Sequence, residues 1–225
     1  MDIVEQLLKI ALLGSAWVLY LLLALSVASI GVMLERLLFF GRNSRRGGEA
    51  LRASLLQALE GGDEEGIERV LRDSGTVEGQ VVADAFAFRD GGGGAVADAL
   101  EAELARSRGG LERGLNFLGT VGNNAPFIGL FGTVIGVIVA FQELGQAQAK
   151  AGAMGNVMSG IAEALVATGV GLFVALPAVI AYNIAQKRVG DIEAQATALG
   201  RLVSAWLEAR ARGGRLHLRA APGGR

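Results

Sequence analysis

Residues 114–142 read GLNFLGTVGNNAPFIGLFGTVIGVIVAFQ and contain no Asp, Glu, Lys or Arg. As a helix rising about 1.5 Å per residue, this run is longer than the roughly 30 Å hydrocarbon core of a bilayer. Two similar runs flank it: residues 10–34 carry no charge, and residues 151–186 carry one ionisable side chain, Glu163. The alternative for each run is a buried helix of a soluble protein. Three runs of this length in one short chain favour transmembrane helices instead.

The composition supports this class and excludes several kinds of function. Hydrophobic residues make up 52% of the 225 residues, charged residues only 19%, and the formal net charge is −1. A near-neutral chain has no basic field to hold nucleic acid, so we expect no nucleic-acid partner. The chain has no Cys and a single His, which excludes a disulfide framework, a zinc finger and a His-based triad. We therefore expect an all-α integral membrane protein that holds no metal or cofactor and is not an enzyme.

The basic residues indicate an orientation in the membrane. They follow the first and third runs: Arg36, Arg42, Arg45, Arg46, Lys187 and Arg188. By the positive-inside rule, residues 1–9 and the link 143–150 face outward, and residues 35–113 face the cytoplasm together with the C-terminal part. Residues 1–9 lack the basic start of a signal peptide, so we read the first run as an uncleaved anchor.

Residues 35–113 are expected to form a cytoplasmic bundle of short helices. Apolar residues recur there at helical spacing, with one helix beginning near Val81. A last helix, from Ala95 to Leu111, is expected to run without a break into the second span, with Ala97 on its apolar face. The Gly91–Gly94 run lacks the Lys-Ser/Thr of a phosphate loop, so it predicts a flexible linker.

The C-terminal part divides into a helix and a tail. Residues 187–212 carry an apolar stripe that needs a partner, either the bundle of the same chain or that of a neighbouring subunit. Residues 213–225 are basic and Gly-rich, and predict a disordered tail.

Small residues line the second and third spans at steps of three and four, a pattern that lets membrane helices approach closely. Pro177 removes one hydrogen bond from the third span and is expected to bend it. The residues that we expect to pack the helices are Gly129, Gly132, Gly136, Gly160, Ala164, Gly171, Ala175 and Pro177.

Three polar side chains within the spans are candidates for an ion pathway. Charge inside a membrane costs on the order of 2.5–3.5 kcal/mol, so Glu163 indicates either a proton or ion route or an outer-interface acid held by neighbouring helices. Thr133 and Thr168 indicate either a polar route or hydroxyls bonded to their own helix carbonyls. The residues alone leave both alternatives open.

The run from Leu115 to Val134, LNFLGTVGNNAPFIGLFGTV, resembles the second-span signature of the ExbB/TolQ/MotA proton-channel family. The run from Ile161 to Asn183, IAEALVATGVGLFVALPAVIAYN, resembles its third-span signature, and the Glu35-Arg36-Leu37 step is also similar. The MotA branch has four spans, so this three-span chain is more similar to the ExbB/TolQ branch.

This resemblance implies the larger subunit of a bacterial inner-membrane motor driven by protonmotive force, with a periplasmic N-terminus and a cytoplasmic C-terminus. Five copies would form a ring around two copies of an ExbD/TolR-like single-span partner, whose Asp takes and releases the proton. Thr133 and Thr168 would face that Asp. Glu163 would lie deeper in the ring, near the proton route or the subunit contacts, and Asn183 near the cytoplasmic exit.

The resemblance leaves the downstream process open among TonB-type nutrient uptake, TolA-type envelope maintenance and gliding motility. The sequence has no long N-terminal extension before residue 10, which favours a TolQ-like or gliding-type system. The alternative function is a non-conducting membrane scaffold that organises cytoplasmic partners. An intramembrane hydrolase is weak, because one Glu without His or a second acid in the spans supplies no acid–base pair.

Overall fold

The computed structural model describes residues 16–42, 45–146 and 153–213. Every element in these ranges is a helix and none is a strand, which confirms the all-α prediction. The predicted outward segment 1–9, residues 147–150 of the predicted link and residues 214–225 of the predicted tail lie outside the described residues.

Three helices are long and apolar enough to cross a membrane: α2 (Ala16–Arg42), α7 (Leu115–Gln146) and α8 (Ala153–Ala211). This confirms the prediction of three transmembrane helices. Helix α8 continues through residue 186 without a break, so the third span and the C-terminal helix are one element.

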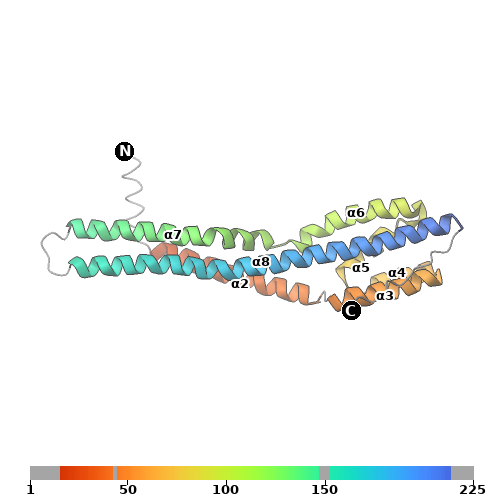
Figure 1. Ribbon diagram of the computed structural model, residues 1–225, viewed down its shortest axis with the longest axis horizontal. Coiled ribbons are helices and arrows are strands. Elements are labelled where there is room, and N and C mark those ends of the chain that lie inside the picture. Colours follow the sequence, from red (N-terminus) through yellow and green to blue (C-terminus); the bar gives the residue numbers. More distant parts are fainter. Residues whose placement is uncertain (1–15, 43–44, 147–152, 214–225) are drawn as a thin grey trace, which may run out of the picture. The chain divides into compact units, whose positions relative to one another are not determined.

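The described residues divide into two compact units. Of the described residues, the membrane unit holds 16–36, 114–146 and 153–184, and the bundle unit holds 37–42, 45–113 and 185–213. Within the membrane unit, α7 and the first part of α8 lie side by side (Figure 1). Their shared core with α2 consists of small and β-branched side chains together with one leucine: Val18, Leu22, Val121, Ala125, Ile135, Val174, Ala175 and Ala178.

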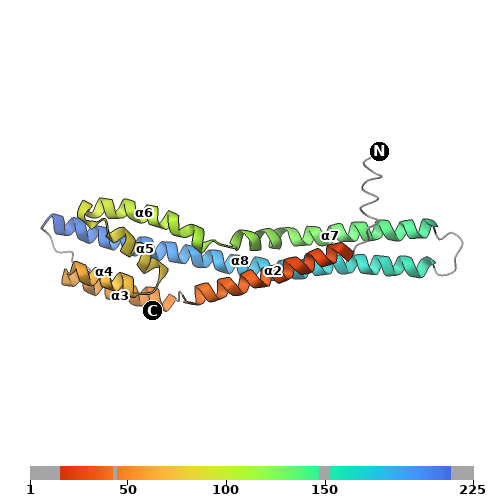
Figure 2. The ribbon, with the colours of Figure 1, turned by 180° about the vertical axis from the view of Figure 1, so that it is seen from behind.

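The bundle unit contains α3 (Arg45–Gly61), α4 (Glu64–Asp73), α5 (Val77–Phe86), the 3-10 turn η1 (Arg89–Gly91), α6 (Gly92–Leu111) and the last part of α8 (Figure 2). The apolar stripe of α8 packs into the core of this unit through Ala196, Leu199, Val203 and Trp206. The partner of the stripe is therefore the bundle of the same chain, one of the two alternatives that the sequence allowed.

Helix α5 begins at Val77, four residues before the predicted start near Val81. Thr76 caps it, because its hydroxyl accepts a hydrogen bond from the backbone N–H of Gly79 at 3.1 Å. The prediction was wrong because it relied on the apolar pattern, whereas the cap residue sets the first turn.

The Gly91–Gly94 run is not a flexible linker. Gly91 ends η1, Gly92 has φ +84°, and α6 starts there. Gly93 is buried at a place where an added Cβ would lie 2.5 Å from the backbone oxygen of Ser204 and 2.7 Å from Cγ of Glu208. The run therefore lets α6 turn and then pack directly against the backbone of α8.

Replacing Gly93 by alanine is expected to destabilise the protein by about 1–3 kcal/mol, because the new methyl meets a backbone oxygen that cannot turn aside. Gly94→Ala is the matched control, since an added Cβ there meets nothing within 4 Å and a helical Gly→Ala change stabilises by roughly 0.5–1 kcal/mol. Thermal unfolding of the two variants in detergent measures the difference. Equal melting temperatures would contradict the close packing of α6 on α8.

The last bundle helix does not run unbroken into the second span. Helix α6 ends at Leu111, and α7 begins at Leu115 after Gly114, whose φ is +74°. This left-handed conformation suits glycine and breaks the helix. On α6, Ala97 is exposed whereas its neighbour Val96 is buried, so the prediction that Ala97 lies on the apolar face was wrong.

Candidate functional site

Thr133 of α7 and Thr168 of α8 form a hydroxyl pair between the two helices. Their Oγ1 atoms are hydrogen-bonded to each other. Oγ1 of Thr133 also lies 3.1 Å from the carbonyl oxygen of Ala164 on α8 and 3.4 Å from that of Gly129 on its own helix. Bonding to its own helix is thus the longest of the contacts that Thr133 makes, and the pair is partly buried.

The pair forms because α7 and α8 approach each other with almost no side chain between them. An added Cβ at Gly129 would lie 2.6 Å from the carbonyl oxygen of Ala167, and one at Gly171 would lie 2.6 Å from that of Ala125. At Gly136, an added Cβ would lie 2.6 Å from Cβ of Ala164. Real Cβ atoms do not make such contacts, so these glycines set the helix spacing.

The other predicted packing residues lie along this contact or beside it. An added Cβ at Gly132 would lie 2.9 Å from Cβ of Ala167, and one at Gly160 would lie 3.2 Å from Cβ of Ala140. Ala175 is buried. Pro177 lies inside α8 but is exposed, so it does not pack against α7 as these glycines do.

Glu163 and Asn183 are exposed on α8 in the single chain. Glu163 directly precedes Ala164, whose side chain is fully buried against α7, so the two side chains point to different sides of the helix. Asn183 lies fifteen residues beyond Thr168, about 22 Å along the helix axis. A carboxyl group within a span generally faces protein or water rather than lipid.

Two further polar residues of α7 were missed by the sequence reasoning. The Thr120 hydroxyl donates to the carbonyl oxygen of Asn116 at 2.7 Å, and the Asn124 amide donates to that of Thr120 at 2.8 Å. Both side chains are exposed, which costs free energy in lipid. Their four-residue spacing within a charge-free run is the signal that could have identified them.

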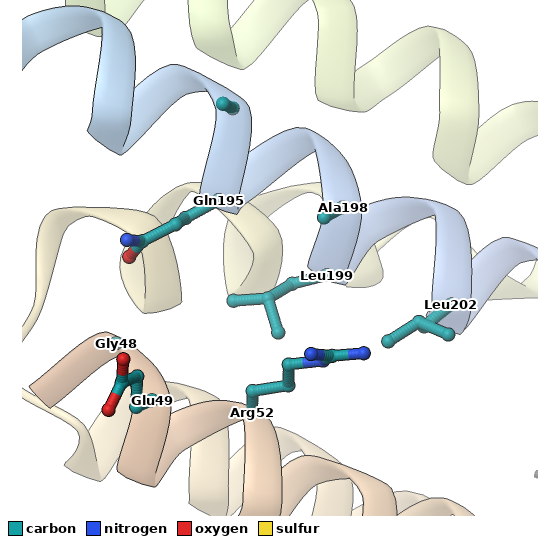
Figure 3. A pocket seen from close by; sticks show the side chains of 8 residues that line it. Gly48, Glu49, Arg52, Gln195, Ala198, Leu199 and Leu202 are labelled. Atoms are coloured by element: carbon teal, nitrogen blue, oxygen red, sulfur yellow. The ribbon is translucent and has the colours of Figure 1, made fainter. Parts of the chain in front are cut away.

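The bundle unit has an open groove between α3 and α8 with a volume of about 440 Å³ (Figure 3). Ala194, Ala198, Leu199 and Leu202 form its apolar wall, and the side chains of Glu49 and Arg52 lie opposite on α3. This groove brings together no nucleophile and base. Among the residues that the structure describes, no cluster of His, Cys, Asp and Glu could hold a metal ion.

Comparison with known proteins shows similarity over parts of both units. The model of the MotA/TolQ/ExbB proton channel family matches residues 74–198. Over 88 residues (39% of this chain), the chain is 49% identical to a Tol-Pal system protein TolQ of Pseudomonas aeruginosa. Over 153 residues (64% of this chain), it is 35% identical to a biopolymer transport protein ExbB of Pseudomonas putida. The chain covers 37% of the length of the first relative and 43% of the second.

Proposed function

Because the chain belongs to the MotA/TolQ/ExbB proton channel family, we propose that it is the proton-channel subunit of an inner-membrane motor. In this proposal it converts protonmotive force into mechanical work on a periplasm-spanning partner. A proton that crosses about 150 mV releases roughly 3.5 kcal/mol, enough to bias a conformational switch. Three helices that are long and apolar enough to cross a membrane agree with a transport role.

The observation that carries the proposal is the hydroxyl pair of Thr133 and Thr168 between two spans. Polar groups inside a membrane are costly and mark ion and proton routes. The pair is partly buried, so it keeps some access to a neighbour. We assign it the role that the family resemblance implies, which is contact with the proton-carrying Asp of an ExbD/TolR-like single-span partner.

The exposed side chains of the spans support an assembly of several chains. Glu163 is an exposed acid, and Phe127 and Phe173 are 68% and 75% exposed on the surfaces of α7 and α8. In the proposed ring of five copies, lipid and neighbouring copies cover the aromatic faces. Glu163 then lies at the proton route or a subunit contact, and Asn183 near the cytoplasmic exit. Two copies of the partner span occupy the pore.

We place the bundle unit in the cytoplasm and the 143–150 link in the periplasm, in line with the basic residues that follow the first and third spans. The relatives named TolQ and ExbB make envelope maintenance and nutrient uptake the first two candidates for the process that is powered, with gliding motility as the third. The competing proposal, a non-conducting scaffold, predicts that uncouplers leave the role of the protein in cells intact.

Glu163→Gln is expected to abolish proton-driven work in cells, because the neutral amide cannot take or release a proton at this position. Glu163→Asp keeps the carboxyl group and is expected to retain part of the activity. The measurement compares the energy-dependent phenotype of cells that carry each variant at equal protein level. Normal function of the Gln variant would remove Glu163 from the proton route.

Native mass spectrometry of the protein, extracted in mild detergent after expression with its genomic neighbours, tests the assembly. We expect five copies that retain a small single-span protein, and the same complex for Glu163→Gln. A monomer, or a ring that never retains such a partner, would favour the scaffold.

A further inference from the structure

The hydroxyl of Thr133 lies near more oxygen atoms than it can donate a hydrogen bond to. A threonine hydroxyl carries one hydrogen, and three oxygens lie near it. Both carbonyl oxygens lie beyond the usual O–H···O range of about 2.5–3.0 Å, but the Ala164 oxygen on the other helix, at 3.1 Å, is nearer than the Gly129 oxygen, at 3.4 Å. When Thr133 donates to Ala164, Thr168 is the donor within the pair. The orientation of both hydroxyls then depends on how far the Ala164 carbonyl lies from α7.

Gly136 controls that distance. It lies one turn beyond Thr133 on α7, and an added Cβ there would lie 2.6 Å from Cβ and 3.2 Å from Cα of Ala164. Ala164 is fully buried, so it has no free space into which to move. A methyl group at position 136 would therefore push away the residue whose carbonyl oxygen accepts the Thr133 hydroxyl.

We propose that Gly136 is a positioning residue for ion transport: its missing side chain holds the Ala164 carbonyl within reach of Thr133 and so orients the Thr133–Thr168 hydroxyl pair. This inference rests on the proposed function, because it gives Gly136 a role in the proton route that goes beyond helix packing. It acts through Thr133, so its effect on transport depends on the Thr133 hydroxyl.

Because the chain contains no Cys, a pair of introduced Cys residues can report the spacing of the two helices. Ala140 and Gly160 face each other one turn beyond Gly136 and Ala164, and a Cβ at Gly160 would lie 3.2 Å from Cβ of Ala140. This is slightly below the Cβ–Cβ separation of a disulfide, about 3.5–4.5 Å, so a small separation of the helices brings the two Cβ atoms into that range. The rate at which the pair Ala140→Cys/Gly160→Cys oxidises in the assembled protein is therefore expected to report the helix spacing.

Gly136→Ala is expected to speed this oxidation severalfold, because the wider helix spacing brings the two Cβ atoms into the disulfide range. The size swap Gly136→Ala/Ala164→Gly removes the methyl group that the new side chain meets, so it is expected to restore the original rate of oxidation. Gly169→Ala is the control, because an added Cβ there meets nothing within 4 Å. Unchanged oxidation in Gly136→Ala would overturn the proposal.

Proton flux through the complete complex in vesicles tests the functional step. Gly136→Ala is expected to lower flux about tenfold when Thr133 is present, and at most about twofold in the Thr133→Val background, where no hydroxyl remains to be positioned. The size swap is expected to recover flux. A role in packing alone would lower flux by the same factor in both backgrounds, which would overturn the proposal. If Thr133→Val has no measurable flux, the size swap provides the test instead. A swap variant that recovers the original oxidation rate but not the proton flux would also overturn the proposal.

Failure of this inference differs from failure of the proposed function. If Thr133→Val and Thr168→Val leave flux unchanged, the pair is not in the proton route, so the role proposed for the pair and the positioning role of Gly136 both fall, whatever the disulfide shows. If those variants lose flux while Gly136→Ala keeps normal flux and oxidation, only the positioning role of Gly136 is overturned.

Discussion

Thr168→Val is expected to abolish proton-driven work while the protein still assembles in the membrane. Valine has nearly the volume of threonine but no hydroxyl, so it removes the hydrogen bond to Thr133 and leaves the close packing of α7 and α8 in place. The proposed contact with the Asp of the partner loses its polar group in a low-dielectric site, where an unpaired polar group costs roughly 1–3 kcal/mol. We expect loss of the energy-dependent phenotype at normal protein level.

Thr168→Ser is the matched control for this prediction. Serine keeps the hydroxyl and loses one methyl group, so it is expected to retain most of the activity. Equal activity of the Val and Ser variants would show that the Thr168 hydroxyl has no part in transport, even if the helices pack as described.

Gly129→Val is expected to have the largest effect on the stability of the membrane unit. Its Cβ would lie 2.6 Å from the carbonyl oxygen of Ala167 and 3.0 Å from Cα of Thr168. Both are backbone atoms, so the helices themselves must separate. Overpacking of this kind costs about 1–3 kcal/mol or more.

Thermal unfolding in detergent or resistance to protease measures this loss. Gly169→Val is the matched control on α8, since an added Cβ there has open space in the single chain. A Gly129→Val protein that melts with the wild type would contradict the close approach of α7 and α8.

The membrane part of the fold was predictable because the bilayer imposes a simple rule. A helix that crosses it must be long and nearly free of charge, and residues 10–34, 114–142 and 151–186 satisfy that rule by composition alone. Small residues at steps of three and four also indicated close helix packing before any contact was known. These signals consist of the length, composition and spacing of residues along the chain, so they can be read from a single sequence.

The details that failed depend on particular backbone conformations and on tertiary contacts. The start of α5 depends on the Thr76 cap, and the break before α7 depends on a left-handed Gly114. The Gly91–Gly94 run looked like a linker because glycine is common in linkers, but the close approach of Gly93 to Ser204 explains it. That contact joins residues more than a hundred positions apart, so no local pattern reports it.

The candidate site was likewise predictable only in part. Helical spacing could nominate Thr133 and Thr168, but they lie on different helices, so their mutual hydrogen bond follows only from how α7 and α8 pack. The bond from Thr133 to the Ala164 carbonyl was outside any sequence pattern, because it uses a backbone atom that every residue possesses.

Proton flux into vesicles that contain the purified complex, driven by an imposed membrane potential, tests the central claim most directly. The account predicts a flux that requires both this chain and its single-span partner, is lost in Thr168→Val and is retained in Thr168→Ser. A complex that contains both chains, holds its potential and passes no protons would contradict the account, and so would a flux that Thr168→Val leaves unchanged.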